Sequence, residues 1–179
     1  AEILPTLKRD NAHVFLKHMA NHTEGWPNPR DFATHKHVLL TRHPRKVLKS
    51  YRAHIDSPTA LDLCYHHQQR WLERCDAEGW PVVVLDSDRL VAAPEQSLGA
   101  VMDWLGVDFD PCMLMWPAGP RQEDGPWAKY WYHRVHASTG WEKVPATDLD
   151  SLPPVDERFF PLVAETEPLF ELLRARALN

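Results

Sequence analysis

The sequence has no apolar run of the about 18 residues that a membrane-spanning helix needs, and it does not begin like a secretory signal. Its first nine residues contain neither a basic opening segment nor an apolar middle segment. Hydrophobic residues make up 44% and charged residues 25% of the chain, with eight tryptophans, which is typical of a soluble globular protein and unlike a disordered one. We therefore expect a single globular domain over residues 1–179.

Basic residues are not in excess, and cysteine is scarce. The net charge is −5, which argues against nucleic acid as a partner, because duplex binding needs a basic face that displaces counterions. Cys64 and Cys75 fall on one predicted helix about 16 Å apart along its axis, too far for a disulfide. Together with Cys112 they form an odd set without a disulfide framework. This pattern favours a reducing compartment, so we expect a cytoplasmic protein without membrane attachment.

Short apolar runs alternate with helical patterns along the chain. Runs at 13–17, 37–42 and 81–86 predict buried strands, because continuous apolar stretches are typical of central strands in a parallel sheet. The helical patterns lie at 44–51, 59–79 and 94–106. This order predicts an α/β fold, with a three-layer parallel sheet flanked by helices.

The second half of the chain is less regular. Residues 107–141 hold four of the eight tryptophans and a mixed charge pattern, and such loops often carry binding groups. Residues 144–156 are rich in Pro and Asp and predict an extended connection. A helical pattern follows over 156–178, where Pro161 and Pro168 should each kink or restart the helix.

The strongest local signal is the stretch 41–51, Thr-Arg-His-Pro-Arg-Lys-Val-Leu-Lys-Ser-Tyr. Arg42 ends a predicted strand, and a proline opens a helix directly afterwards. Open parallel sheets bind ligands at such points, where free N–H groups and the helix dipole favour an anion. Arg42 can offer a planar fork to phosphate oxygens, and Ser50 lies two turns into the helix. The competing explanation is an ion pair between Arg42 and Asp86 or Asp88.

This stretch resembles the 3′-phosphate-binding motif of sulfotransferases, in which an Arg ends a strand and a Ser-Tyr pair lies in the next helix. The resemblance implies that Arg42 and Ser50 bind the 3′-phosphate of 3′-phosphoadenosine 5′-phosphosulfate. Residues 119–131, Gly-Pro-Arg-Gln-Glu-Asp-Gly-Pro-Trp-Ala-Lys-Tyr-Trp, are similar to the late glycine-rich loop that folds over the nucleotide in that family. The matching positions in this loop are Arg121, Gly125, Trp127 and Lys129.

Sulfotransferases also place a catalytic base, usually His, after an early strand that presents a Lys. Residues 15–22, Phe-Leu-Lys-His-Met-Ala-Asn-His, offer either His22 or His18 as the base and Lys17 as a charge stabiliser. An imidazole suits this role because its ordinary pKa of about 6.5 lets it accept a proton near neutral pH. The choice between the two histidines stays open.

The histidine pairs His18/His22 and His133/His136 have helical spacing, which raises the question of a metal site. Neither a Cys-x-x-Cys nor a His-Glu-x-x-His motif accompanies them, so we expect no metal. A Gly-x-Ser-x-Gly elbow is also lacking, which argues against a serine hydrolase.

Taken together, the chain is identified as a member of a bacterial group of sulfotransferase-like P-loop proteins, some of which carry aminotransferase-like names. The resemblance covers about residues 10–145 and implies sulfuryl transfer from 3′-phosphoadenosine 5′-phosphosulfate to a small hydroxyl or amine acceptor. No Gly-rich or Lys-Ser-Gly-Thr-like segment precedes His13, so we expect the N-terminal strand-loop-helix that binds the 5′-phosphosulfate to be missing.

Two hypotheses follow from that missing unit. In the first, the chain is a sulfotransferase whose missing unit is supplied by upstream sequence, a homo-oligomer or a partner chain. In the second, it is a degenerate, non-catalytic module that acts through protein contacts. A sugar or nucleoside kinase-like P-loop enzyme fits less well, because it needs the same loop and magnesium-binding acids that the sequence does not show.

Overall fold

A computed structural model describes residues 13–23, 32–126, 128–142 and 149–178. Two strands, β1 (His37–Thr41) and β2 (Val82–Asp86), pair in parallel over their whole length. An isolated parallel bridge between Val84 and Ala177 brings the end of the chain to the other side of β2. The strands predicted at 37–42 and 81–86, and their parallel direction, are confirmed.

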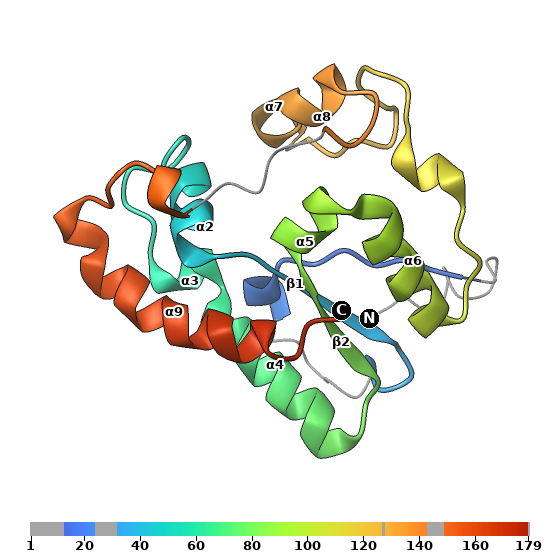
Figure 1. The fold of residues 1–179 in the computed structure, drawn as a ribbon, viewed down its shortest axis with the longest axis horizontal. Helices are drawn as coiled ribbons and strands as arrows, with labels where there is room; N and C mark the ends of the chain where they lie inside the picture. Colours follow the sequence, from blue (N-terminus) through green and yellow to red (C-terminus); the bar gives the residue numbers. More distant parts are fainter. Residues whose placement is uncertain (1–12, 24–31, 127, 143–148, 179) are drawn as a thin grey trace.

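Helices cover both faces of this small sheet (Figure 1). On one face α4 (Tyr65–Glu78) and α9 (Phe160–Arg174) enclose a core that includes Val84. On the other face α5 (Ser87–Ala92) and α6 (Pro94–Leu105) pack on the neighbouring Leu85. Successive strand residues face opposite sides, so two adjacent apolar residues serve two cores. The α/β class is confirmed, but the wider sheet of a three-layer P-loop core stays a prediction, because the described residues contribute two strands and one bridge.

The strand predicted at 13–17 is wrong. Residues 13–19 have no regular structure, and a short 3-10 helix, η1 (Ala20–Thr23), follows them. Phe15 is 85% exposed. An apolar run makes a central strand only when neighbouring strands and helices enclose it, and nothing in the described part of the chain encloses Phe15 in this way.

The helix predicted over 59–79 is two helices. α3 (Ala60–Leu63) ends at Cys64, whose left-handed φ of 66° turns the chain before α4 begins. Thr59 begins α3 as predicted, and its N–H donates to the carboxylate of Asp62 at 2.7 Å. Gly79, with a φ of 68°, ends α4 as predicted. The break at Cys64 carries no glycine or proline signal, so periodicity alone does not reveal it.

The remaining helices follow the predicted order. α2 (Pro44–Tyr51) comes directly after β1, and α6 ends at Gly106. A 3-10 helix, η5 (Glu157–Phe159), leads into α9, which continues through Pro168. Of the predicted kink or restart at Pro168, the restart is therefore wrong, because α9 is continuous there. Core packing of Phe170 and Leu173, on the following turn, offsets the lost hydrogen bond.

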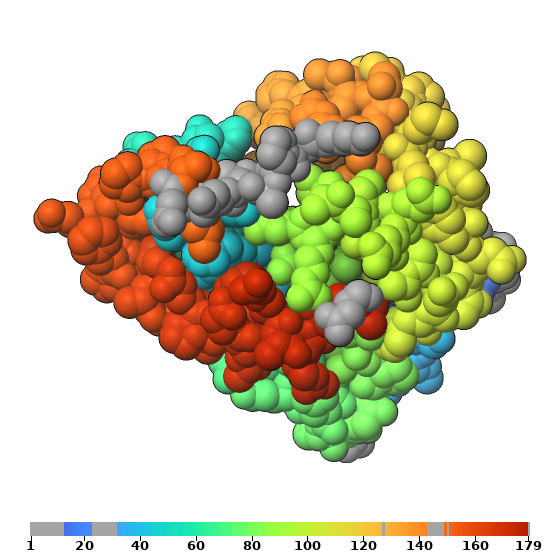
Figure 2. Space-filling model, viewed as in Figure 1, coloured from blue at the N-terminus to red at the C-terminus, as the bar shows by residue number. Residues whose placement is uncertain are grey.

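The segment between α6 and α9 contains short elements only, η3 (Pro111–Leu114), α7 (Ala128–Trp131), α8 (His133–Ala137) and η4 (Leu149–Ser151). Figure 2 shows α7 and α8 (orange) on the outside of the molecule, above α5 in the view of Figure 1. Part of the predicted extended connection, residues 144–148, lies outside the described residues. None of the described helices is both long and apolar enough to cross a membrane.

Candidate functional site

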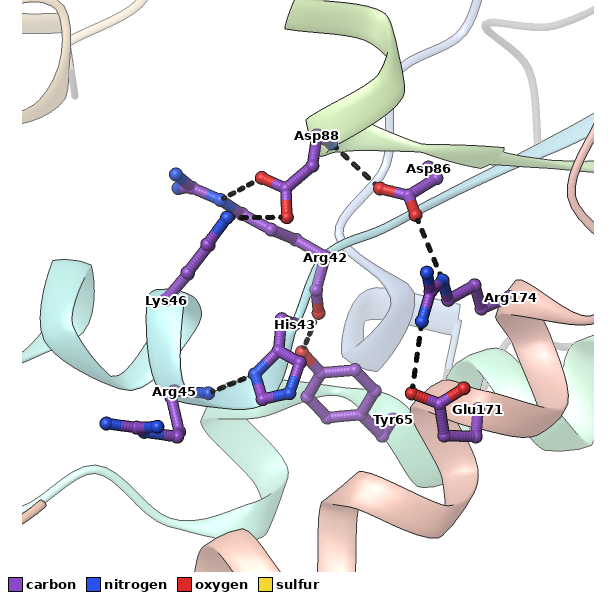
Figure 3. Close-up of polar contacts among 9 residues, drawn as sticks. All are labelled: Arg42, His43, Arg45, Lys46, Tyr65, Asp86, Asp88, Glu171 and Arg174. Carbon is purple, nitrogen blue, oxygen red and sulfur yellow. Dashed lines mark hydrogen bonds and ion pairs between the residues drawn. The ribbon is translucent and has the colours of Figure 1, made fainter. Parts of the chain in front are cut away.

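Arg42 stands where β1 ends and α2 begins, as the sequence predicts, and its side chain is 45% exposed. Its Nε lies 3.8 Å from Oδ1 of Asp88, a distance too long for a hydrogen bond, so the two groups form a loose ion pair. Figure 3 shows the two terminal nitrogens of Arg42 pointing away from that carboxylate. The ion pair that the sequence offers as an alternative to phosphate binding thus exists with Asp88. It leaves the two terminal nitrogens of the guanidinium accessible.

Lys46 also belongs to this cluster, although the sequence suggests an ordinary surface charge at this position. Its side chain is only 7% exposed, and Nζ donates to Oδ2 of Asp88 at 2.8 Å. Buried lysines are rare unless paired. Ser50 lies one helical turn beyond Lys46 on α2, and residues four apart share a helix face. Ser50 is exposed and extends the face of α2 that bears Lys46. The sequence feature that indicates a shared helix face is the i, i+4 spacing of Lys46 and Ser50.

The main chain at Arg42 is held from the opposite side by α4. The hydroxyl of Tyr65 donates to the carbonyl oxygen of Arg42, and Tyr65 is only 2% exposed. Burial raises the pKa of Tyr65 well above its ordinary range, so the hydroxyl keeps its proton. Gln68, one turn further along α4, donates to the carbonyl oxygen of Leu40 at 2.9 Å. The end of β1 therefore has a fixed position.

The start of α2 differs from the sequence-based expectation of free N–H groups. Pro44 has no N–H, the N–H of Arg45 donates to Nδ1 of His43 at 3.2 Å, and the N–H of Lys46 donates to the carbonyl oxygen of His43 at 2.9 Å. His43 thus caps the helix that an anion was expected to cap. Burial lowers the pKa of His43, which keeps Nδ1 available as an acceptor, although nearby Glu167 opposes that shift. An anion at this point must be held by side chains.

Asp88 is itself fixed by a second acid, Asp86, at the end of β2. Oδ1 of Asp86 accepts the backbone N–H of Asp88 at 2.8 Å and so begins α5. Oδ2 of Asp86 lies 3.7 Å from Nε of Arg174 on α9. Another nitrogen of the same guanidinium, Nη1, lies 3.5 Å from Oε1 of Glu171 (Figure 3). Asp86 is buried. Of the two acids proposed as partners of Arg42, Asp88 pairs with it and Asp86 fixes the position of Asp88.

The late loop is ordered around Asp124. Its carboxylate accepts the backbone N–H of Arg121 at 2.9 Å and contacts Nε2 of His136 at 2.8 Å. The N–H of Arg121, and secondarily His136, hold the pKa of Asp124 below its ordinary range. The carbonyl oxygen of Gly125 accepts the N–H of Ala128 at 3.0 Å, which leads into α7.

The other matched positions of this loop differ in what the structure shows. Lys129 is exposed, with its ammonium 4.9 Å from the centre of the Tyr130 ring, and Trp127 lies outside the described residues. The ring of Trp131 lies 4.6 Å from that of His54 and 6.1 Å from that of Tyr51. The two matched motifs therefore meet near the end of α2 that carries Ser50. Within the described ranges, no hydrogen bond or ion pair joins Arg121 or Lys129 to Arg42.

The candidate base and its lysine lie in the early segment. His22 is in η1, which packs against α4, and the ring of His18 stands edge-on to that of Phe32 at 6.3 Å. Burial and, secondarily, His22 lower the pKa of His18. Lys17 is exposed. Across the residues that the structure describes, nothing bonds these three side chains to Arg42, so their roles remain predictions.

Metal-binding side chains do not gather in the described part of the chain. No group of three or more His, Cys, Asp or Glu residues there lies close enough to hold a metal ion. The three cysteines are free, two of them buried and Cys112 exposed.

Comparison with known proteins places the chain in a family. The family model for a sulfotransferase domain matches residues 3–177, so the chain belongs to the sulfotransferase domain family. Two similar proteins from Arabidopsis thaliana are named branched-chain-amino-acid aminotransferase-like proteins 1 and 2. They are 34% identical over 145 and 143 residues, covering 78% of this chain. The chain spans 24% of the length of each. No solved structure matches it.

Proposed function

We propose that this chain binds 3′-phosphoadenosine 5′-phosphosulfate and takes part in sulfuryl transfer to a small hydroxyl or amine acceptor. One observation carries the proposal: in a member of the sulfotransferase family, the guanidinium of Arg42 is exposed at a strand end, and its terminal nitrogens have no hydrogen-bond partner among the described residues. A guanidinium in this state is suited to the paired oxygens of a phosphate.

The charge of the surrounding cluster fits an anion. Arg42 and Lys46 carry two positive charges and Asp88 carries one negative charge, which leaves one positive charge for the ligand. Arg42 would hold the 3′-phosphate with two parallel N–H donors, and the hydroxyl of Ser50 would donate a further hydrogen bond. Since His43 occupies the backbone donors at the start of α2, these side chains would provide the binding energy.

The other roles in the proposal follow from family resemblance. Arg121 and Lys129 would add positive charge from the late loop, and Gly125 and Trp127 would let that loop close over the nucleotide. The contact of Trp131 with α2 supports a loop placed beside Ser50. During transfer the acceptor oxygen or nitrogen bonds to sulfur, and the bond from sulfur to the 5′-phosphate oxygen breaks, which releases adenosine 3′,5′-bisphosphate. The acceptor proton passes to His22 or His18. Lys17 would stabilise the developing charge.

A thermal-shift measurement with adenosine 3′,5′-bisphosphate tests the donor assignment. At a ligand concentration 100-fold above Kd, linkage predicts about 2.7 kcal/mol of added stability. For a chain of this length that corresponds to roughly 5–11 °C in Tm. Arg42→Ala should abolish the shift and Ser50→Ala should reduce it. Lys49→Ala, which removes one exposed positive charge from the same helix, should leave most of it. No shift at millimolar ligand, or an equal shift in Arg42→Ala, contradicts the assignment.

A second candidate function is that of a non-catalytic module that binds other proteins. It is favoured by exposed apolar side chains, with Phe15 at 85% and Leu40, on β1, at 51% exposure. The two candidates differ in the same assay: the module predicts no Arg42-dependent nucleotide shift. Leu40→Ser and Phe15→Ser would then weaken capture of a partner without changing Tm by more than about 2 °C, as expected for exposed positions.

A further inference from the structure

The carboxylate of Asp88 occupies the centre of the Arg42 cluster, which is unexpected beside a site for an anion. One of its oxygens faces Nε of Arg42 at 3.8 Å, and the other accepts the ammonium of Lys46 at 2.8 Å (Figure 3). A negative charge so close to a phosphate would normally repel it. The placement of Asp88 therefore calls for a compensating role.

We propose that Asp88 is a positioning residue for the anion site, which holds Arg42 by Nε so that both terminal nitrogens face the 3′-phosphate of the ligand. This inference rests on the proposed function. A free arginine side chain loses rotamer entropy when it binds a ligand. An arginine already restrained at Nε loses less of it, so the pairing improves affinity through preorganisation.

The surroundings of Asp88 fit this role. Its backbone N–H is bonded to Asp86, and Asp86 is buried beside Arg174. The carboxylate is therefore attached to a fixed turn and not to a mobile loop. On the other side of the pair, Tyr65 fixes the main chain of Arg42. The arginine is thus restrained at both its carbonyl oxygen and its Nε, while the end of the side chain stays accessible.

Lys46 explains how a carboxylate is tolerated at this point. Its buried ammonium, 2.8 Å from Oδ2, offsets the charge of Asp88, so a bound phosphate meets a nearly neutral pair in place of a bare negative charge. The two oxygens of Asp88 then have separate tasks. Oδ2 is neutralised by Lys46, and Oδ1 is left to restrain Arg42.

Two explanations of Asp88 predict opposite effects of removing its charge. If Asp88 acts only as a nearby negative charge, Asp88→Asn should strengthen binding of an anionic ligand. If it positions Arg42, the same change should weaken binding, and only for ligands that carry a 3′-phosphate. The sign of the effect therefore separates the two explanations without reference to its size.

The experiment measures Kd by calorimetry for adenosine 3′,5′-bisphosphate and adenosine 5′-monophosphate, and takes the ratio as the preference for the 3′-phosphate. In Asp88→Asn we expect that preference to fall about two- to fivefold, the effect of losing one partly exposed ion pair. Asp103→Asn removes an exposed negative charge on α6 and should leave the preference unchanged. Partial unfolding of Asp88→Asn would lower both affinities together and so would not alter the ratio.

The outcomes are distinct. An unchanged or increased preference in Asp88→Asn, with a preference in the wild-type chain that Arg42→Ala removes, overturns the inference and leaves the proposed function intact. A wild-type chain without any preference overturns both. A fall in preference confined to Asp88→Asn and Arg42→Ala supports the positioning role.

Discussion

The buried hydroxyl of Tyr65 should contribute measurably to stability, because it holds the end of β1 in place. Tyr65 is only 2% exposed, and its hydroxyl donates to the carbonyl oxygen of Arg42, 23 residues earlier in the chain. Tyr65→Phe removes this hydrogen bond and retains the ring that packs in the core beside Leu72 and Val84. The substitution therefore tests the link between α4 and the strand end with little change in packing.

The magnitude follows from two terms. A hydrogen bond of this kind contributes about 0.5–1.5 kcal/mol net, and leaving a buried acceptor without a partner costs about 1–3 kcal/mol. Arg42 is an exposed residue, so water can partly satisfy its carbonyl oxygen and the lower values apply. We expect Tyr65→Phe to lower the free energy of unfolding by about 1–2 kcal/mol. This corresponds to roughly 2–8 °C in Tm for a chain of this length.

Urea unfolding, followed by tryptophan fluorescence, measures this change directly. Tyr130→Phe is the matched control, because Tyr130 is exposed and its loss of a hydroxyl should alter stability by less than about 0.5 kcal/mol. If Tyr65→Phe unfolds at the same urea concentration as the wild-type chain, the hydroxyl does not anchor Arg42, and the reasoning is refuted.

Further predictions concern the helix cap and two glycines. Burial lowers the pKa of His43 in the folded chain, so the unfolded chain binds a proton at a higher pH than the folded chain does. The contribution of neutral His43 to stability is therefore complete above about pH 6.5 and is lost as the pH falls below that value. His43→Asn should flatten the decline in Tm between pH 6.5 and 5, and an unchanged slope would count against the cap. Gly140→Ala should cost about 1–3 kcal/mol, since a Cβ there would meet the carbonyl oxygen of Leu114 at 2.9 Å. Gly99→Ala, in open space on α6, should instead stabilise the chain by about 0.4–1 kcal/mol, and equal effects of the two alanines on urea unfolding would contradict the geometry.

The regular part of the fold is readable from local sequence signals. β1, β2, α2 and α6 carry their own boundaries, because prolines open the helices and Gly106 ends α6. The break at Cys64 and the passage of α9 through Pro168 depend on tertiary packing and override local preference. The run at 13–17 has the composition of a strand, yet composition does not determine which strands will pair with it.

The site shows the same division. Arg42 and Ser50 are predictable because a strand end followed by a proline-opened helix places them locally. Asp88 and Lys46 form a pair 42 residues apart in sequence, and Tyr65 reaches back 23 residues to Arg42. The parallel pairing of β1 with β2 brings Lys46, which follows β1, close to Asp88, which follows β2. Sequence patterns name Asp88 as a possible ion-pair partner but do not indicate that Lys46 is buried against it.

The most direct test is a crystal structure of the chain with adenosine 3′,5′-bisphosphate. Our account predicts the 3′-phosphate on the terminal nitrogens of Arg42 and the hydroxyl of Ser50, with Asp88 still facing Nε. A nucleotide bound elsewhere, or a guanidinium turned away from the phosphate onto Asp88, would contradict it.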